Sequence, residues 1–129
     1  MLSDRFRAAV EAEDPDALTD ALADDVVFRS PAVFKPYGGK AVVSAILVQG
    51  AMKVFEDFRY TDQLEGSDVA TLIFCARVGD RELDGLDLLR FDADGKVSEL
   101  MVMVRPMSGL NALAEAMTRR FEDAGIATA

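Results

Sequence analysis

The segment from Arg81 to Phe91 has the period of a β-strand, in which every second side chain points to the same face. One of those faces carries Leu83, Leu89 and Phe91 and is expected to be buried. The next four residues, Asp92–Gly95, predict a tight turn, because Asp starts turns and Gly accepts a left-handed backbone. The apolar residues that follow predict a returning strand, so the pattern indicates an antiparallel hairpin.

Strand patterns also occur elsewhere in the chain. The second strand of the hairpin is expected over Val97–Arg105, whose two faces are both apolar. Phe58–Leu64 and Val69–Val78 precede the hairpin, with Gly-containing turns after each of them. A shorter strand is expected over Val26–Pro31. The strands therefore gather in the second half of the chain, which favours antiparallel pairing.

Helical spacing of apolar residues predicts four helices. Ser3 can cap the first helix, and Asp14–Pro15 can start the second, with Asp as the cap and Pro at the first helical position. The long apolar segment Lys40–Phe55 predicts a third helix that is covered on most sides. A last helix is expected after Pro106, ending near Gly125. Helices first and strands later predict an α+β domain.

Asp87 is the most informative polar residue in this pattern. It lies between apolar neighbours on the face of its strand that is expected to be buried. Burying a carboxylate is costly unless the group is protonated or hydrogen-bonded, and such residues often mark functional pockets. Asp87 is therefore the candidate catalytic residue, and the alternative is a structural acid that pairs with an Arg or a Tyr.

Composition excludes several kinds of function. The chain of 129 residues has 23 Asp and Glu against 14 Lys and Arg, so a nucleic-acid partner is not expected. It contains no His, which excludes Ser-His-Asp and Cys-His catalysis, and its one Cys cannot form a usual zinc site. We expect no metal and no cofactor. No apolar run is long enough for a membrane span, and neither a signal peptide nor a disulfide is apparent, so we expect a cytoplasmic protein.

The order of the elements resembles the nuclear transport factor 2-like fold of the SnoaL-like polyketide cyclases and ketosteroid isomerases. The most specific segments are ALADDVVFRSP (Ala21–Pro31) and LDLLRFDADGKVSEL (Leu86–Leu100). The resemblance implies one SnoaL-like domain over residues 1–129. Its fold class would be α+β, with a cone-shaped, curved antiparallel sheet packed on three helices from the N-terminal half, plus a C-terminal helix.

The resemblance also assigns roles to three positions. In the ketosteroid isomerases a Tyr and a protonated Asp form an oxyanion hole, and an Asp before a proline is the base. Asp87 matches the oxyanion-hole acid. Phe6 stands at the Tyr position and has no hydroxyl, and Ser30 stands at the base position. Steroid isomerisation by that mechanism is therefore not expected.

The leading interpretation is a domain that binds an apolar, carbonyl-bearing small molecule in the cone. One alternative is an isomerase, cyclase or hydratase with Asp87 as general acid or base. Another is an interaction module with a vestigial pocket, and in each case a homodimer through the outer sheet face around Leu100–Val104 is expected. Tyr60 is expected to make cross-strand packing. The residues expected to contact the ligand are Phe6, Phe28, Ser30, Tyr37, Asp87 and Leu89.

Overall fold

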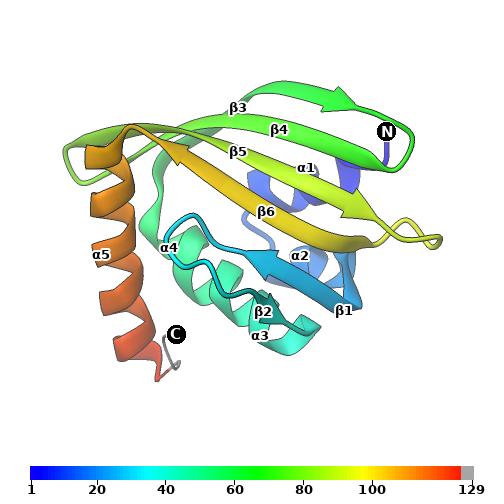
Figure 1. The fold of residues 1–129 in the computed structure, drawn as a ribbon, viewed down its shortest axis with the longest axis horizontal. Helices are drawn as coiled ribbons and strands as arrows, with labels where there is room; N and C mark the ends of the chain where they lie inside the picture. The colour runs from blue at the N-terminus through cyan, green and yellow to red at the C-terminus, as the bar shows by residue number, and fades with distance from the viewer. Residues whose placement is uncertain (126–129) are drawn as a thin grey trace.

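The computed structural model describes residues 1–125 and has a curved sheet with helices on its concave side (Figure 1). The six strands lie side by side in the order β2-β1-β6-β5-β4-β3. The strands are β1 (Leu22–Arg29), β2 (Tyr37–Gly38), β3 (Glu56–Glu65), β4 (Val69–Val78), β5 (Arg81–Phe91) and β6 (Val97–Arg105). The expected α+β class and curved sheet are confirmed.

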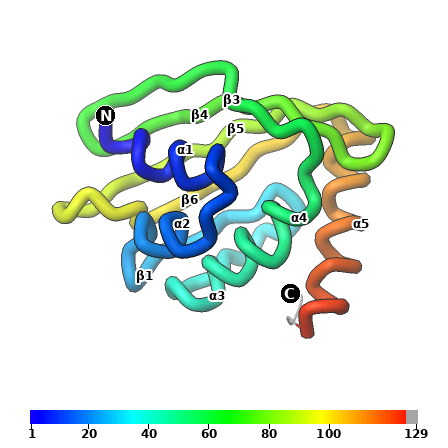
Figure 2. Tube along the Cα trace, turned by 180° about the vertical axis from the view of Figure 1, so that it is seen from behind, coloured from blue at the N-terminus to red at the C-terminus, as the bar shows by residue number. Residues whose placement is uncertain are grey.

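Helices cover the concave face and one end of the sheet, as Figure 2 shows from behind. The helical elements are α1 (Asp4–Glu11), α2 (Pro15–Ala21), α3 (Lys40–Ile46), the π-helical segment η1 (Leu47–Ala51), α4 (Met52–Val54) and α5 (Met107–Ala124). The last helix, α5, leaves the end of β6 and passes beside η1 and α4. Within residues 1–125, no helix is long and apolar enough to cross a membrane.

The central hairpin forms as its sequence predicts. Leu83, Asp87 and Leu89 are buried on the concave face of β5. Gly95 has a φ of 77°, in the left-handed region, and Asp92 Oδ1 accepts hydrogen bonds from the backbone N–H groups of Asp94 and Lys96. The turn residues therefore act as their types suggest.

Several element boundaries, one stretch of helix and one strand direction differ from the prediction, and the first strand ends at Arg29 rather than Pro31. The first strand begins at Leu22 rather than Val26, because the side chain of Leu22 is fully buried and its backbone pairs with Val97. The third helix runs from Lys40 to Val54 but contains the π-helical segment η1. The sheet is antiparallel except that β1 and β6 are parallel, since the long connection between them returns the chain in the same direction.

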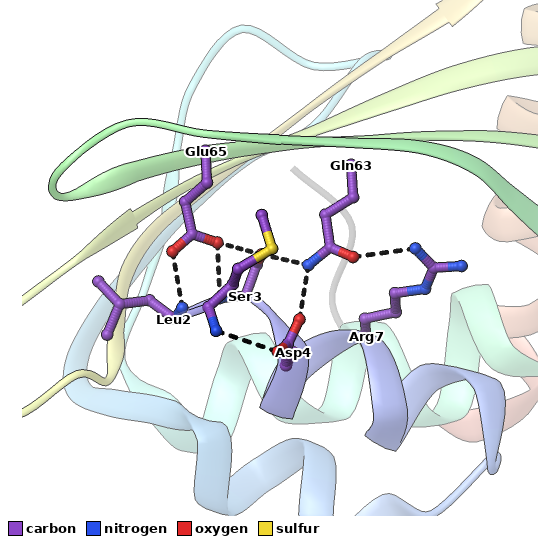
Figure 3. A network of polar contacts seen from close by, with 7 residues as sticks. Leu2, Ser3, Asp4, Arg7, Gln63 and Glu65 are labelled. Atoms are coloured by element: carbon purple, nitrogen blue, oxygen red, sulfur yellow. Dashed lines mark hydrogen bonds and ion pairs between the residues drawn. The ribbon is translucent and has the colours of Figure 1, made fainter.

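Ser3 has a different role from the expected helix cap. Its hydroxyl does not cap α1. It donates instead to Glu65 Oε2 at 2.6 Å and accepts from Gln63 Nε2 at 2.7 Å (Figure 3). Gln63 also donates to Asp4 Oδ1 and accepts from Arg7 Nη1. Because Ser3 is fully buried, this network fixes the start of α1 against β3.

Candidate functional site

A cavity of about 580 Å³ lies between the concave face of the sheet and the helices. Its size is in the range of small-molecule sites. Most of its wall is apolar or aromatic, and side chains from all six strands and from each helical element contribute to it. The larger apolar members are Phe6, Leu18, Phe28, Ile46, Leu47, Met52, Phe55, Phe58, Phe74, Leu100, Leu113, Met117 and Phe121.

Asp87 is the buried acid in this wall. Only 7% of its surface is exposed, and it comes from the centre of β5. Burial raises the pKa of Asp87 to about 7, although a hydrogen bond from Tyr60 acts in the opposite direction. A substantial fraction of the molecules therefore carries a neutral Asp87 near neutral pH, and a neutral carboxylic acid can donate a hydrogen bond.

Tyr60 supplies the partner of Asp87. The hydroxyl of Tyr60 donates to Asp87 Oδ2 at 3.1 Å. Burial, and then the charge of Asp87, raise the pKa of Tyr60 well above its ordinary value, so the phenol keeps its proton. The Arg7 guanidinium lies over the Tyr60 ring, 5.4 Å from its centre. The predicted cross-strand packing of Tyr60 is confirmed, since its ring meets Phe74 of β4 edge-on at 6.3 Å. Its hydrogen bond to Asp87 is the pairing with a Tyr that was the structural alternative for that acid.

The register of the sheet explains how Tyr60 reaches Asp87. Tyr60 on β3 pairs with Phe74 on β4, and Phe74 pairs with Gly85 on β5. Asp87 is two residues further along the same face of β5. Alternation in the sequence places all of these side chains on one face, but the sequence holds no signal for the register that brings two of them together.

Only one of the two Asp87 oxygens is used by this hydrogen bond. Within residues 1–125, every fully buried side-chain oxygen or nitrogen has a hydrogen-bond partner. The second oxygen, Oδ1, has none in that part of the chain, so it must keep contact with open space. Because Asp87 belongs to the cavity wall, we infer that this space is the cavity. The carboxyl group thus has one oxygen held by Tyr60 and one that can meet a ligand.

Five of the six residues expected to contact a ligand line the cavity: Phe6, Phe28, Ser30, Tyr37 and Asp87. Leu89 does not line it. Although it shares a face with Asp87, it lies two residues further along β5, where it is fully buried in the packed core. The Ser30 hydroxyl accepts a hydrogen bond from the backbone N–H of Ala32 at 3.0 Å.

Other charged groups in the cavity wall lie on its exposed rim. Glu11 pairs with Arg7, and Asp57 pairs with Arg77 at 2.7 Å. Glu13 completes the acidic part of the rim. In residues 1–125 no group of three or more His, Cys, Asp or Glu side chains is placed to hold a metal ion. The candidate chemistry of the cavity therefore centres on Asp87 and Tyr60.

Known proteins with this architecture include one close relative. A steroid delta-isomerase from Pseudomonas aeruginosa is 46% identical, with a TM-score of 0.90 over 95% of this chain and 90% of that chain. An uncharacterised protein with a cystatin-like fold from Silicibacter pomeroyi is 28% identical, with a TM-score of 0.91 over 96% of this chain and 87% of that one. An NTF2-like protein of unknown function from Cytophaga hutchinsonii shares the fold at 18% identity, with a TM-score of 0.65 over 83% and 89% of the two chains.

Comparison with models of protein families adds a second line of evidence. No curated protein matches the chain. The family model of the SnoaL-like domain matches residues 4–100, from the start of α1 into β6. This match means that the chain belongs to the SnoaL-like domain family, and the chain shares its fold with an NTF2-like protein and with a steroid delta-isomerase.

Proposed function

We propose that the cavity binds an apolar small molecule whose carbonyl oxygen accepts a hydrogen bond from neutral Asp87. The observation that carries this proposal is the Tyr60–Asp87 pair in an otherwise apolar wall. Tyr60 holds one carboxyl oxygen, which leaves the other to donate to the ligand. The open volume of about 580 Å³ supports ligand binding over an interaction module with a vestigial pocket.

Catalysis is the second candidate function. The relative at 46% identity is named a steroid delta-isomerase, which favours an isomerase, cyclase or hydratase in which Asp87 is the general acid or base. A neutral acid beside a Tyr hydroxyl can stabilise negative charge that develops on a carbonyl oxygen. Tyr60 does not replace the hydroxyl that is missing at Phe6, because its one O–H is donated to Asp87 Oδ2, and it supports the ligand contact only through Asp87. Ser30 still lacks a group that would make it a base, so any proton abstraction needs another carboxylate.

The fluorescent naphthyl ketone Prodan tests the binding proposal, because its emission reports the polarity around its carbonyl. We expect wild-type protein to bind Prodan more tightly at about pH 5.5 than at about pH 8.5, since only neutral Asp87 donates. Asp87→Asn should bind with little pH dependence, because an amide also donates. Asp87→Leu should weaken binding roughly 5- to 10-fold, as expected for one hydrogen bond.

Thr118→Val is the matched control for these variants. Thr118 also lines the cavity, but its hydroxyl is already used by the backbone oxygen of Ala114 at 3.0 Å. Its replacement should change the Prodan dissociation constant less than about twofold, because no donor to the ligand is lost. The proposal is refuted if the Prodan dissociation constant is the same at both pH values and in Asp87→Leu, while Asp87→Leu strongly destabilises the fold. Asp87 would then be a structural residue.

We also propose that a second copy of the chain covers the outer face of the sheet. Side chains opposite to the cavity form an apolar stripe there, with Leu88 paired to Met101 and Leu86 paired to Met103. Met103 is 54% exposed. Ion pairs border the stripe at both ends, between Arg90 and Glu99 and between Arg105 and Asp84. An apolar centre with a charged rim is typical of an interface between proteins.

Light scattering at micromolar concentration checks this proposal. We expect the mass of a dimer, with an interface that buries on the order of 1,200 Å² or more in total. Met103→Glu should shift the protein to monomers, because it places a charge in the apolar centre. Val42→Glu is the control, since Val42 is also exposed but lies on α3, away from the outer face. A wild-type monomer would contradict the proposal.

A further inference from the structure

We propose that α5 is the end wall of the cavity and that Met117, packed over Gly50, sets the length of ligand that the cavity accepts. This inference rests on the proposed function. It adds a residue that determines ligand size, on an element that lies beyond the matched SnoaL-like segment, residues 4–100.

The first step is the position of α5. Its inward side contributes Leu113, Ala114, Met117 and Phe121 to the cavity wall. Leu113, Met117 and Phe121 are four positions apart, and Ala114 lies three positions before Met117, so they form one stripe on the helix. The pair of Asp87 and Tyr60 comes instead from the sheet, Asp87 from the inner strand β5 and Tyr60 from the edge strand β3. One wall of the cavity thus carries the polar pair and α5 supplies a wall that is apolar apart from Thr118, whose hydroxyl already has a partner.

The second step is the contact between α5 and η1. Gly50 is buried in η1, and a methyl group added at its Cα would lie 2.5 Å from Met117 Cε and 2.8 Å from Phe121 Cε1. Only glycine therefore allows these two side chains to lie where they do. Next to this contact, Arg120 Nε donates to the backbone oxygen of Gln49 at 2.8 Å, which holds α5 against η1.

The third step follows from the surroundings of Met117. The side chain has Gly50 on one side and the cavity on another, so added bulk at position 50 displaces its flexible thioether toward the cavity. Such a displacement shortens the space available to a ligand. The present cavity volume of about 580 Å³ leaves room for a two-ring ketone such as Prodan.

Two ketones of different length test the inference, the two-ring Prodan and the one-ring acetophenone. Their dissociation constants are compared in wild type, Gly50→Ala and the double variant Gly50→Ala/Met117→Ala. Gly50→Ala should weaken Prodan binding roughly 10-fold or more relative to acetophenone, as expected when a pocket loses space for a few carbon atoms. Met117→Ala should restore the wild-type ratio in the Gly50→Ala background, because the shorter side chain removes the obstruction.

Ala114→Leu provides a second variant that does not depend on Gly50. It adds bulk directly to the α5 wall in a helix-compatible residue and should also disfavour Prodan. Circular dichroism checks that each variant is folded. A Prodan-to-acetophenone ratio that stays within about twofold of wild type in both folded variants overturns the inference but leaves the proposed function intact. Wild-type protein that binds neither ketone overturns both.

Discussion

Asp87→Asn is expected to stabilise the folded protein by roughly 2–4 kcal/mol at about pH 8 and by much less at about pH 4. The reason is the difference in pKa of Asp87 between the two states, about 7 in the folded protein against 3.8 for a free side chain. Between these values the folded state binds more protons than the unfolded state. The stability of the wild type therefore decreases as the pH rises through this window and levels off above about pH 7.

Chemical denaturation at a fixed protein concentration over this pH range measures the effect. Asn has nearly the same shape as protonated Asp, and its amide oxygen can still accept the hydrogen bond from Tyr60. The variant Tyr60→Phe is a second test of this link between the pKa of Asp87 and the stability of the protein. It removes the hydrogen bond that lowers the pKa of Asp87, so the loss of stability should extend to higher pH. A gain from Asp87→Asn that is equal at both ends of the range would contradict the assignment.

Gly85→Ala is expected to reduce the free energy of unfolding by roughly 2–3 kcal/mol. The ring of Phe74 lies over Gly85, and an added methyl group would be only 2.0 Å from Phe74 Cζ. The ring has little room to move aside, because it stacks on Phe58 at 4.7 Å and meets the edge of Phe55 at 5.5 Å. Since Phe74 lines the cavity, its displacement should also weaken Prodan binding.

Gly38→Ala is the matched control for this variant. Gly38 is also in a strand, but a methyl group added there has no atom within 4 Å. Its replacement should change the stability by less than about 0.5 kcal/mol. Adding Phe74→Leu to Gly85→Ala should recover part of the lost stability, because the smaller side chain removes the clash. Equal effects of the two Gly→Ala variants in thermal or chemical unfolding would refute the explanation.

Local patterns were sufficient to predict most of the fold. Alternation along β5 predicted the buried position of Asp87, because successive side chains of a strand must point to opposite faces. Asp92 and Gly95 identified the hairpin turn, and Asp14 with Pro15 identified the start of α2. These features depend on residues that are neighbours in the chain, and for that reason the sequence contains enough information to assign them.

Features that depend on distant contacts were not predictable in this way. The early start of β1 at Leu22 depends on its pairing with β6, and the π-helical segment around Gly50 packs against α5. Ser3 resembles a helix cap in the sequence, but Glu65, far along the chain, takes its hydrogen bond. In each case a tertiary contact replaced the local preference of the residue.

The candidate site also has one part that the sequence predicted and one part that it did not. The sequence by itself determined that one acid, Asp87, would be buried in an apolar face, because the two-residue period of a strand places Asp87 on the same face as its apolar neighbours Leu83 and Leu89. Only the tertiary structure decided that Tyr60 is its partner and that α5 contributes to the cavity wall. Tyr60 reaches Asp87 across an intervening strand, β4, whose register shifts beside Tyr60. Such distances depend on the alignment of strands and the packing of helices, which no local pattern of residues specifies.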